Sequence, residues 1–289
     1  MSGPVPEWVL TAFAAVTVFT VMFTLGLGIA ASELRWLWRH PGPIVRGLFC
    51  VLVAVPAAAL AITRGLELPR LAEIGIVLMA ISPGAPVALR RSLSAGGHRA
   101  FAPSLQIGVA ALAVVSMPLS IAALNHVYAG HAAISPWDVA RQVFVAQLLP
   151  LGLGIAIRHS NEPLAARIEP HLARIGTLLL VMLAVLALVA TWEVTVRAGL
   201  RVAAAIVLTT AAALGLGHAL GGPEPATRTA VAITSAARNP GLALLVATLN
   251  SAPPAVKTTV LAYLVISVFA IVPYVVWRRH ARGRTPMAP

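Results

Sequence analysis

Long apolar segments alternate with short polar connectors along the whole chain. The apolar segments are roughly 16 to 25 residues long, which is the length that a helix needs to cross a bilayer core. They cover residues 8–32, 44–63, 70–90, 100–125, 138–157, 174–192, 202–217, 229–249 and 256–277. Because no connector is long enough to form a second domain, the pattern predicts an all-α polytopic membrane protein. We expect nine transmembrane helices in a single transmembrane domain over residues 1–289.

The composition supports a chain that lies in a lipid bilayer. Apolar residues make up 59% of the chain and charged residues only 10%, whereas a soluble domain carries about 25% charged residues. The single cysteine, Cys50, excludes a disulfide framework and a cysteine-based zinc site. The start of the chain, MSGPVPEW, has no basic stretch, so we do not expect the first segment to be a signal peptide.

The basic residues predict the orientation of the chain. A formal net charge of +12 could suggest a nucleic-acid partner, but the basic residues segregate between alternate connectors, fourteen on one side and six on the other. By the positive-inside rule, the richer side is cytoplasmic. We therefore expect a multi-pass protein of the cytoplasmic (inner) membrane, with its N-terminus outside, its C-terminus in the cytoplasm and no nucleic-acid partner.

Two of the nine segments carry helix-breaking residues at their centres. The third contains SPGAP at residues 82–86, and the eighth contains RNPG at residues 238–241. Proline removes a backbone donor and clashes with the preceding turn, whereas glycine tolerates the resulting geometry. The expected breaks involve Pro83, Gly84 and Pro86 in the third segment, and Pro240 and Gly241 in the eighth.

The pairing of the two breaks predicts the architecture. A lone proline in a span commonly marks a kink, but two breaks at corresponding positions of two halves indicate inverted repeats. The first repeat would cover residues 8–126 with four helices, and the second would cover residues 138–279 with five. In such a fold the two discontinuous helices cross and build a site at the membrane midplane.

Three stretches of the chain resemble the bile acid:sodium symporter family and its bacterial relatives. They are FTLGLGIAASELRWLWRHPGPIVRGLFC, GLELPRLAEIGIVLMAISPGAPVAL and ARNPGLALLVATL, and the resemblance extends over nearly the whole chain. It implies a core domain with two crossing, broken helices and a smaller panel domain beside it. The panel would consist of segments one, five and six, and the core of the remaining segments.

The chain departs from the resemblance at the sodium ligands. Sodium-coupled members of that family ligate two sodium ions through an acidic residue, a glutamine and small polar side chains. The acidic position is Thr234 here, and its glutamine is Arg238. Asn239 is retained, and the other ligand positions carry Val51, Ala88, Leu89, Ala102 and Gln106. A sodium site needs oxygen ligands, usually with a carboxylate, and no acidic residue lies away from the ends of the spans, since Glu73 is near a membrane edge. We therefore predict no metal site and no coupling to sodium.

Arg238 is the only charge in the eighth segment, and such a charge costs about 2.5–3.5 kcal/mol on insertion. We expect it to face the bundle interior, where two roles stay open. It could replace a sodium ion by bonding to carbonyls freed at helix ends, or it could clamp an anionic substrate. The half-helices that begin after the breaks would add their positive N-terminal ends to either role. The candidate substrate-binding residues are Arg238, Asn239, Thr234, Ser235, Ser82 and Gln106.

These observations favour a secondary transporter of a small organic anion over two alternatives. A non-transporting sensor or scaffold on a transporter fold would also fit the loss of the sodium ligands. A membrane-embedded enzyme would need paired carboxylates, or a nucleophile with a base, facing a cavity, and no Asp, Glu or His lies deep in a span. We expect no cofactor and no catalytic residue, and the pattern determines neither the substrate, the direction of transport, the coupling ion nor the oligomeric state.

Overall fold

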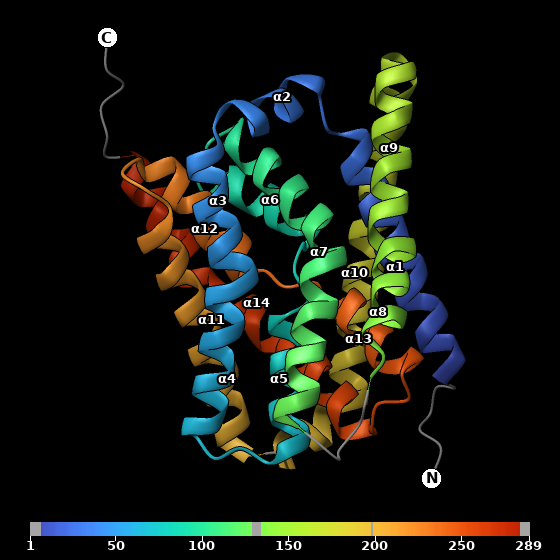
Figure 1. The fold of residues 1–289 in the computed structure, drawn as a ribbon, viewed down its shortest axis with the longest axis vertical. Helices are drawn as coiled ribbons and strands as arrows, with labels where there is room; N and C mark the ends of the chain where they lie inside the picture. The colour runs from blue at the N-terminus through green and yellow to red at the C-terminus, as the bar shows by residue number, and fades with distance from the viewer. Residues whose placement is uncertain (1–6, 129–133, 198, 284–289) are drawn as a thin grey trace.

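A computed structural model of the chain is a bundle of helices, most of which run along the long axis of the molecule (Figure 1). The structure describes residues 7–128, 134–197 and 199–283. Within these ranges the regular structure is helical throughout, which confirms the predicted all-α class. The two chain ends, MSGPVP and RTPMAP, lie outside the described residues.

Most of the helices overlap the apolar segments of the sequence, whereas α2 lies almost entirely between the first two segments. Some segments consist of one helix, and others are divided by a break or by a π-helical turn. In chain order the elements are α1 (Glu7–Leu27), α2 (Ala31–Arg39), α3 (Pro41–Phe49), the π-helical turn η1 (Cys50–Ala54), α4 (Val55–Gly65), α5 (Arg70–Ala80), α6 (Pro86–Ser94), α7 (Phe101–Val127), α8 (Pro136–Val143), the π-helical turn η2 (Phe144–Leu148), α9 (Leu149–Ser160), α10 (Glu162–Arg197), α11 (Gly199–Leu220), α12 (Pro225–Ala236), α13 (Pro240–Leu249) and α14 (Pro254–Gly283).

In the described residues, six helices are long and apolar enough to cross a membrane, or seven if α1 and α2 together count as one bent span. The six are Pro41–Gly65, Phe101–Val127, Pro136–Ser160, Gly199–Leu220, Pro225–Leu249 and Pro254–Ala281. Two of them, Pro41–Gly65 and Pro136–Ser160, each contain a π-helical turn. The length and apolar composition of these helices therefore support a polytopic membrane bundle.

The first predicted segment ends earlier than its apolar pattern suggests. Residues 8–32 were expected as one helix, but α1 stops at Leu27 and the chain bends by 86° into α2. The Glu33 carboxylate accepts a hydrogen bond from the Ala30 N–H at 2.9 Å and so fixes the start of α2. Partial burial raises the pKa of Glu33. The helix α2 then lies across one end of the bundle (Figure 1).

The first break separates α5 from α6 by residues 81–85. Pro83 cannot donate to the helix, and Gly84 adopts a left-handed backbone with φ +87°. Pro86 then begins α6, where its missing N–H costs nothing. The helix is therefore interrupted at SPGAP, where Gly84 has a backbone conformation that favours glycine.

The second break separates α12 from α13 by residues 237–239, which are non-helical. Pro240 is the first residue of α13. Gly241 differs from Gly84, because it is helical and serves close packing: a Cβ there would lie 2.6 Å from the Val18 Cγ2 atom of α1. In Figure 1, α6 and α12 lie in the upper half of the molecule and α5 and α13 in the lower half.

The helices form two groups that pack against each other. On one side α1 packs against α9 and α10, whereas on the other α11 packs against α12 and α14, and α5 packs against α14. Small residues allow α1 and α9 to approach closely. A Cβ at Gly26 would overlap the Leu151 carbonyl oxygen, and one at Gly154 would overlap the Phe23 carbonyl oxygen. The LGLGIAA and LGLGIAI patterns therefore serve helix packing.

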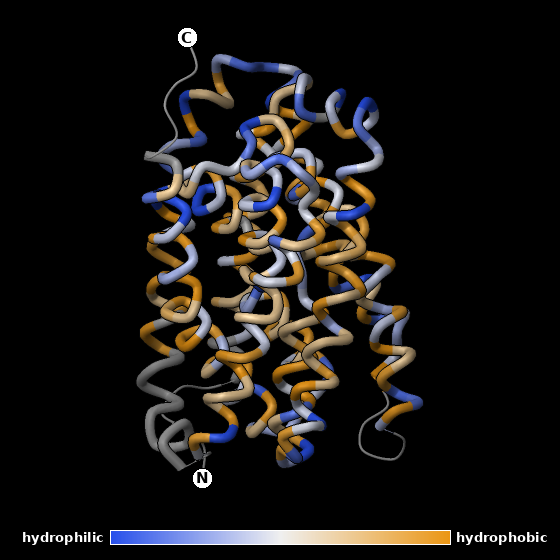
Figure 2. Tube along the Cα trace, turned by 90° about the vertical axis from the view of Figure 1, so that its left-hand side faces the viewer, coloured by the Kyte–Doolittle hydropathy of each residue, from blue (hydrophilic) through white to orange (hydrophobic). Residues whose placement is uncertain are grey.

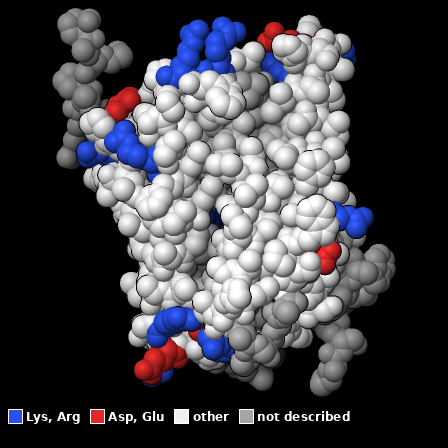
Figure 3. All heavy atoms as spheres, viewed as in Figure 1, with Lys and Arg blue, Asp and Glu red and all other residues white. Residues whose placement is uncertain are grey.

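The surface separates charged and apolar regions as a membrane protein requires. Apolar positions dominate the middle of the bundle (Figure 2). On the face seen in Figure 3, most Lys, Arg, Asp and Glu side chains gather at the two ends, and the broad band between them is largely uncharged. A belt of this kind suits the hydrocarbon core of a bilayer.

Candidate functional site

The two breaks meet in the centre of the molecule. The Asn239 N–H of the second break donates a hydrogen bond to the Ser82 carbonyl of the first, at 2.9 Å. The Asn239 Oδ1 atom accepts from the Leu242 N–H at 3.1 Å and caps α13. The Ser82 hydroxyl turns back to the Leu78 carbonyl at 2.7 Å. Two stretches that lie far apart in the sequence thus meet at one crossing.

Arg238 lies beside this crossing and is 95% buried, since only 5% of its surface is exposed. Its Nη1 atom donates to the Ala80 carbonyl at 2.8 Å and to the Val51 carbonyl at 3.0 Å. These acceptors belong to α5 and η1, so the guanidinium joins three parts of the bundle. Charge-assisted bonds of this kind are about twice as strong as neutral ones.

Both acceptors are carbonyls that the helices leave free. Ala80 is the last residue of α5, and the chain leaves the helix before a later N–H can reach it. In η1 the Val55 N–H donates to Cys50 rather than to Val51. The next residue, Pro56, has no N–H to offer. The sequence therefore creates two unsatisfied acceptors, and Arg238 supplies donors to both.

The other predicted site residues are all buried near the two breaks. Thr234 and Ser235 lie in the last turn of α12, and the Ser235 Oγ is 3.3 Å from the Cys50 Sγ. Gln106 of α7 donates through Nε2 to the Ala85 carbonyl at 3.1 Å, beside the first break. The structure brings Arg238, Asn239, Thr234, Ser235, Ser82 and Gln106 together around the crossing, each with at most 5% of its surface exposed.

Gln147 also reaches the crossing, and the sequence reasoning missed it. It is fully buried in η2. Its Nε2 atom donates to the Ala110 carbonyl of α7 at 3.1 Å, and its Oε1 atom faces the Asn239 amide at 3.5 Å. A Cβ at Gly84 would lie 3.3 Å from the Nε2 atom. A lone glutamine amid the apolar run FVAQLLP was the available signal, since polar residues inside a span are costly.

A cavity of about 1050 Å³ lies between the α1 and α10 side and the α6, α12 and α14 side. Three arginines and three glutamates contribute to its walls: Arg90, Arg99, Arg278, Glu33, Glu169 and Glu224. Arg90 of α6 forms an ion pair with Glu169 of α10 at 3.2 Å. This pair connects the two helix groups at the end of the molecule where α6 finishes.

A second cavity of about 800 Å³ lies at the opposite end of the same boundary, between α1, α8 and α13. Asp138, Arg141 and Gln142 contribute polar groups to it. Asn250, just after α13, donates to the Gln142 side chain at 3.0 Å. The crossing lies between the two cavities, and within the described residues Arg238 and Asn239 line neither of them.

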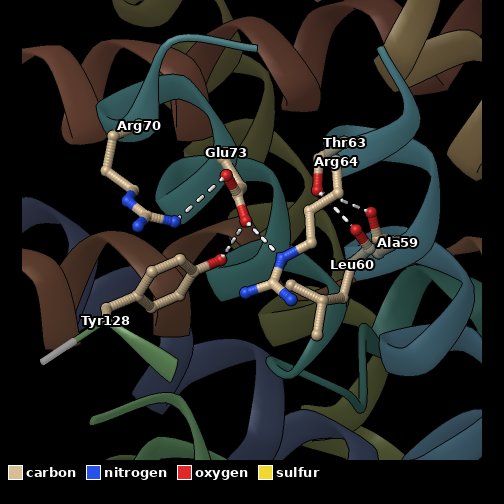
Figure 4. A network of polar contacts seen from close by, with 7 residues as sticks. All are labelled: Ala59, Leu60, Thr63, Arg64, Arg70, Glu73 and Tyr128. Atoms are coloured by element: carbon tan, nitrogen blue, oxygen red, sulfur yellow. Dashed lines mark hydrogen bonds and ion pairs between the residues drawn. The ribbon is translucent and has the colours of Figure 1, made fainter. Parts of the chain in front are cut away.

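Glu73 lies apart from the crossing, in the first turn of α5 (Figure 4). Its Oε1 atom accepts from the Tyr128 hydroxyl at 2.8 Å and from the Arg64 Nε at 3.4 Å, and its Oε2 atom lies 3.6 Å from Arg70. Burial, followed by the hydrogen bond to Glu73 and its charge, raises the pKa of Tyr128. The carboxylate is therefore engaged by three side chains. The described residues contain no group of three His, Cys, Asp or Glu that could hold a metal ion.

Comparisons with known proteins agree with this architecture. The Sodium Bile acid symporter family matches residues 15–198. The chain is 23% identical over 247 residues to an uncharacterised sodium-dependent transporter, YocS, of Bacillus subtilis, which covers 82% of this chain and 75% of that protein. It is 25% identical over 178 residues to a sodium-dependent organic anion transporter of Rattus norvegicus, and the aligned region covers 61% of this chain and 48% of that protein. The chain therefore belongs to the Sodium Bile acid symporter family, whose members are multi-pass membrane transporters rather than enzymes.

Proposed function

We propose that this protein is a secondary transporter of a small organic anion in the cytoplasmic membrane and that it works without sodium coupling. Nine spans in a single transmembrane domain, residues 1–289, form two inverted repeats, residues 8–126 and 138–279. Support comes from the helical bundle, in whose described residues six or seven helices are long and apolar enough to cross a membrane, and from the two broken helices that meet at the crossing. The panel consists of α1, α8, η2, α9 and α10, and the remaining spans form the core.

The observation that carries this proposal is the pair of cavities on opposite sides of the crossing. Both lie at the boundary between panel and core, and buried contacts close the space between them. Those contacts are Val18 on Gly241 and Gln147 on Gly84 and Asn239. If the panel rocks against the core, the larger cavity closes while the smaller one opens. The Arg90–Glu169 and Gln142–Asn250 contacts then act as alternate closures at the two ends.

The charges of the site favour an anionic substrate. Three arginines and three glutamates line the larger cavity and balance one another in formal charge, so the preference for an anion rests on the helix ends. The half-helices α6 and α13 both begin at the crossing, and the N-terminal ends of helices attract anions. We place the substrate beside Asn239, with Thr234, Ser235, Ser82 and Gln106 shaping the core side and Gln147 the panel side.

Arg238 is assigned the role of a built-in cation. It supplies positive charge to the broken helices, as a bound sodium ion does in sodium-coupled transporters, but it cannot dissociate during the cycle. The relatives named above are called sodium-dependent, so this chain would differ from them in its coupling. Its contacts with the Ala80 and Val51 carbonyls support this assignment over a direct clamp on the substrate.

Uptake into proteoliposomes tests the proposal. Thermal-shift screening of taurocholate and short carboxylates first identifies a ligand, because a ligand raises the melting temperature by mass action. Uptake of that ligand should then proceed equally in sodium and in potassium. A tenfold loss of affinity or rate in potassium would contradict sodium independence. Binding without any uptake would instead identify a sensor or scaffold.

A reporter fusion tests the orientation. The richer basic side, with Arg90, Arg99 and Arg278, is placed in the cytoplasm, so the larger cavity opens inward. A reporter that is active only in the cytoplasm should be active when fused after Pro289. A silent reporter, with the protein present in the membrane, would show that the number of spans or the orientation is wrong.

A further inference from the structure

The guanidinium of Arg238 is only partly satisfied by the protein. A guanidinium has five N–H groups, and both hydrogen bonds of Arg238 leave from Nη1. The Nε and Nη2 atoms are shielded from solvent and have no hydrogen-bond partner among the described residues. Unmade hydrogen bonds of a buried charged group are costly, so these donors point to a missing acceptor.

A second unpartnered donor lies close to this guanidinium. The Tyr263 side chain of α14 is fully buried, and its hydroxyl lies beside the Thr210 hydroxyl, which donates to the Ile206 carbonyl at 2.8 Å. The Tyr263 hydroxyl itself makes no well-formed hydrogen bond within the described part of the chain. Tyr263 is the titratable group that interacts most strongly with Arg238 through charge. A tyrosine hydroxyl could accept from arginine, yet the two groups make no hydrogen bond. The two groups therefore lie in the same part of the interior, and each keeps a donor without a well-formed hydrogen bond.

The charge of the region is also uncompensated. No carboxylate within the described residues forms an ion pair with Arg238, and Glu73 is already held by Arg64 and Arg70. An isolated charge in a low-dielectric interior is unfavourable unless an opposite charge accompanies it. A water molecule could fill the hydrogen bonds of Arg238 and Tyr263, but it would leave the positive charge unbalanced.

We propose that a small monovalent inorganic anion, chloride in size and charge, binds inside the core between the Nε and Nη2 groups of Arg238 and the hydroxyl of Tyr263. The anion only accepts hydrogen bonds, and the free N–H groups of Arg238 and the Tyr263 hydroxyl can all donate to it. It is a resident ion, distinct from the substrate that the proposed function places beside Asn239. It balances the charge that Arg238 brings into the crossing, and it is bound whether or not transport is independent of sodium.

Bromide provides a direct test, since it resembles chloride and scatters anomalously. The full-length protein would be purified and crystallised with bromide replacing chloride throughout, and data collected at the bromine absorption edge. We expect an anomalous peak beside the Arg238 guanidinium and the Tyr263 hydroxyl. Density there without an anomalous signal would identify water, and either that result or empty density would overturn the proposal.

Thermal unfolding gives an independent test in solution. The melting temperature of the purified protein should rise as chloride replaces gluconate at constant ionic strength, and it should saturate as expected for one site. Tyr263→Phe removes one donor and keeps the ring, so the half-saturating chloride concentration should increase about tenfold. Tyr128→Phe, which also removes a hydroxyl but lies at the membrane edge, should keep the wild-type value.

Two results would overturn the chloride site in this experiment. One is an equal melting temperature in chloride and gluconate. The other is an equal half-saturating chloride concentration in Tyr263→Phe and Tyr128→Phe. That result would show that chloride stabilises the protein by binding somewhere other than beside Tyr263. Sodium-dependent uptake would contradict the proposed function and leave the bromide peak unchanged, so the two proposals fail separately.

Discussion

Arg238 and Glu73 are both buried charged residues, but the protein satisfies them in different ways. Glu73 lies at the start of α5 and is held by two arginines and a tyrosine side chain (Figure 4). Arg238 lies in the break between α12 and α13 and is held by two backbone carbonyls. Among the protein's described groups, one charge is balanced by side chains of opposite charge, and the other by backbone dipoles.

The difference follows from the position of each charge in the bundle. At the end of α5, long arginine side chains can pair with Glu73 while they keep part of their surface exposed, 49% for Arg64 and 42% for Arg70. In the centre, any added charged partner would have to be buried as well. The broken helices offer carbonyls there at no extra cost, because their acceptors are already free. A helix break therefore suits a cation that has no carboxylate partner in the protein.

Removal of the Arg238 charge is expected to have the largest effect. Arg238→Gln keeps one donor group for two freed carbonyls and removes the charge assistance, so the free energy of unfolding should fall by about 2–3 kcal/mol. Uptake of every substrate should fall with it. Arg238→Lys should recover part of the loss, since a point charge cannot reproduce the planar fork. Denaturant unfolding in detergent micelles measures the change.

Arg64→Gln is the matched control for Arg238→Gln, because it removes a partly exposed arginine from the Glu73 cluster. Arg64→Gln should lower the free energy of unfolding by only about 0–1 kcal/mol. Arg238→Gln could instead unfold like the wild type but bind the transported anion about ten- to a hundredfold more weakly. Arg238 would then contact the substrate directly, and its assignment as a built-in cation would be wrong. Wild-type stability together with wild-type affinity would contradict both roles.

Neutralisation of Glu73 should have a smaller effect than neutralisation of Arg238. Glu73→Gln still accepts from the Tyr128 hydroxyl, and the two arginines can turn their exposed ends to water. We expect the free energy of unfolding to fall by about 1–2 kcal/mol, with little change in uptake. The same unfolding assay measures it. If Glu73→Gln lowers the free energy of unfolding as much as Arg238→Gln does, a buried charge at the membrane edge is not easier to neutralise than one in the centre.

Alkaline pH should produce the smallest effect, and Tyr128 makes the Glu73 cluster sensitive to it. The pKa of Tyr128 is raised above its usual value of about 10, so the folded state holds this proton more tightly than the unfolded state. The resulting stabilisation is complete below about pH 10 and is lost as the pH rises through the folded pKa. Unfolding free energies measured across this range should decline.

Two variants assign that decline to Tyr128. Tyr128→Phe should flatten the alkaline slope, because the titrating hydroxyl is absent. Glu73→Gln should lower the pKa of Tyr128, which the ultraviolet absorbance of phenolate reports, since it removes the negative charge beside the hydroxyl. An unchanged slope in Tyr128→Phe would show that another group titrates.

Much of the fold could be predicted from the sequence because the bilayer constrains it strongly. Apolar length indicated the helical segments, and SPGAP and RNPG marked both breaks, because proline and glycine act through the local backbone. Burial of Arg238 followed from the cost of its charge in lipid. The end of α1 was misplaced, since Ile29 and Ala30 extend the apolar run beyond the helix.

Only the tertiary structure decided which groups meet. That Val51 would offer a free carbonyl depended on the π-helical turn at Cys50–Ala54, which has no mark in the sequence beyond Pro56. Gln147 entered the site because η2 packs against α7 and the crossing. The Tyr128 hydroxyl donates to the Glu73 carboxylate although 55 positions separate the two residues. Local sequence sets where a backbone must break and which side chains must be buried, whereas the partners of a buried polar group depend on helix packing across the bundle.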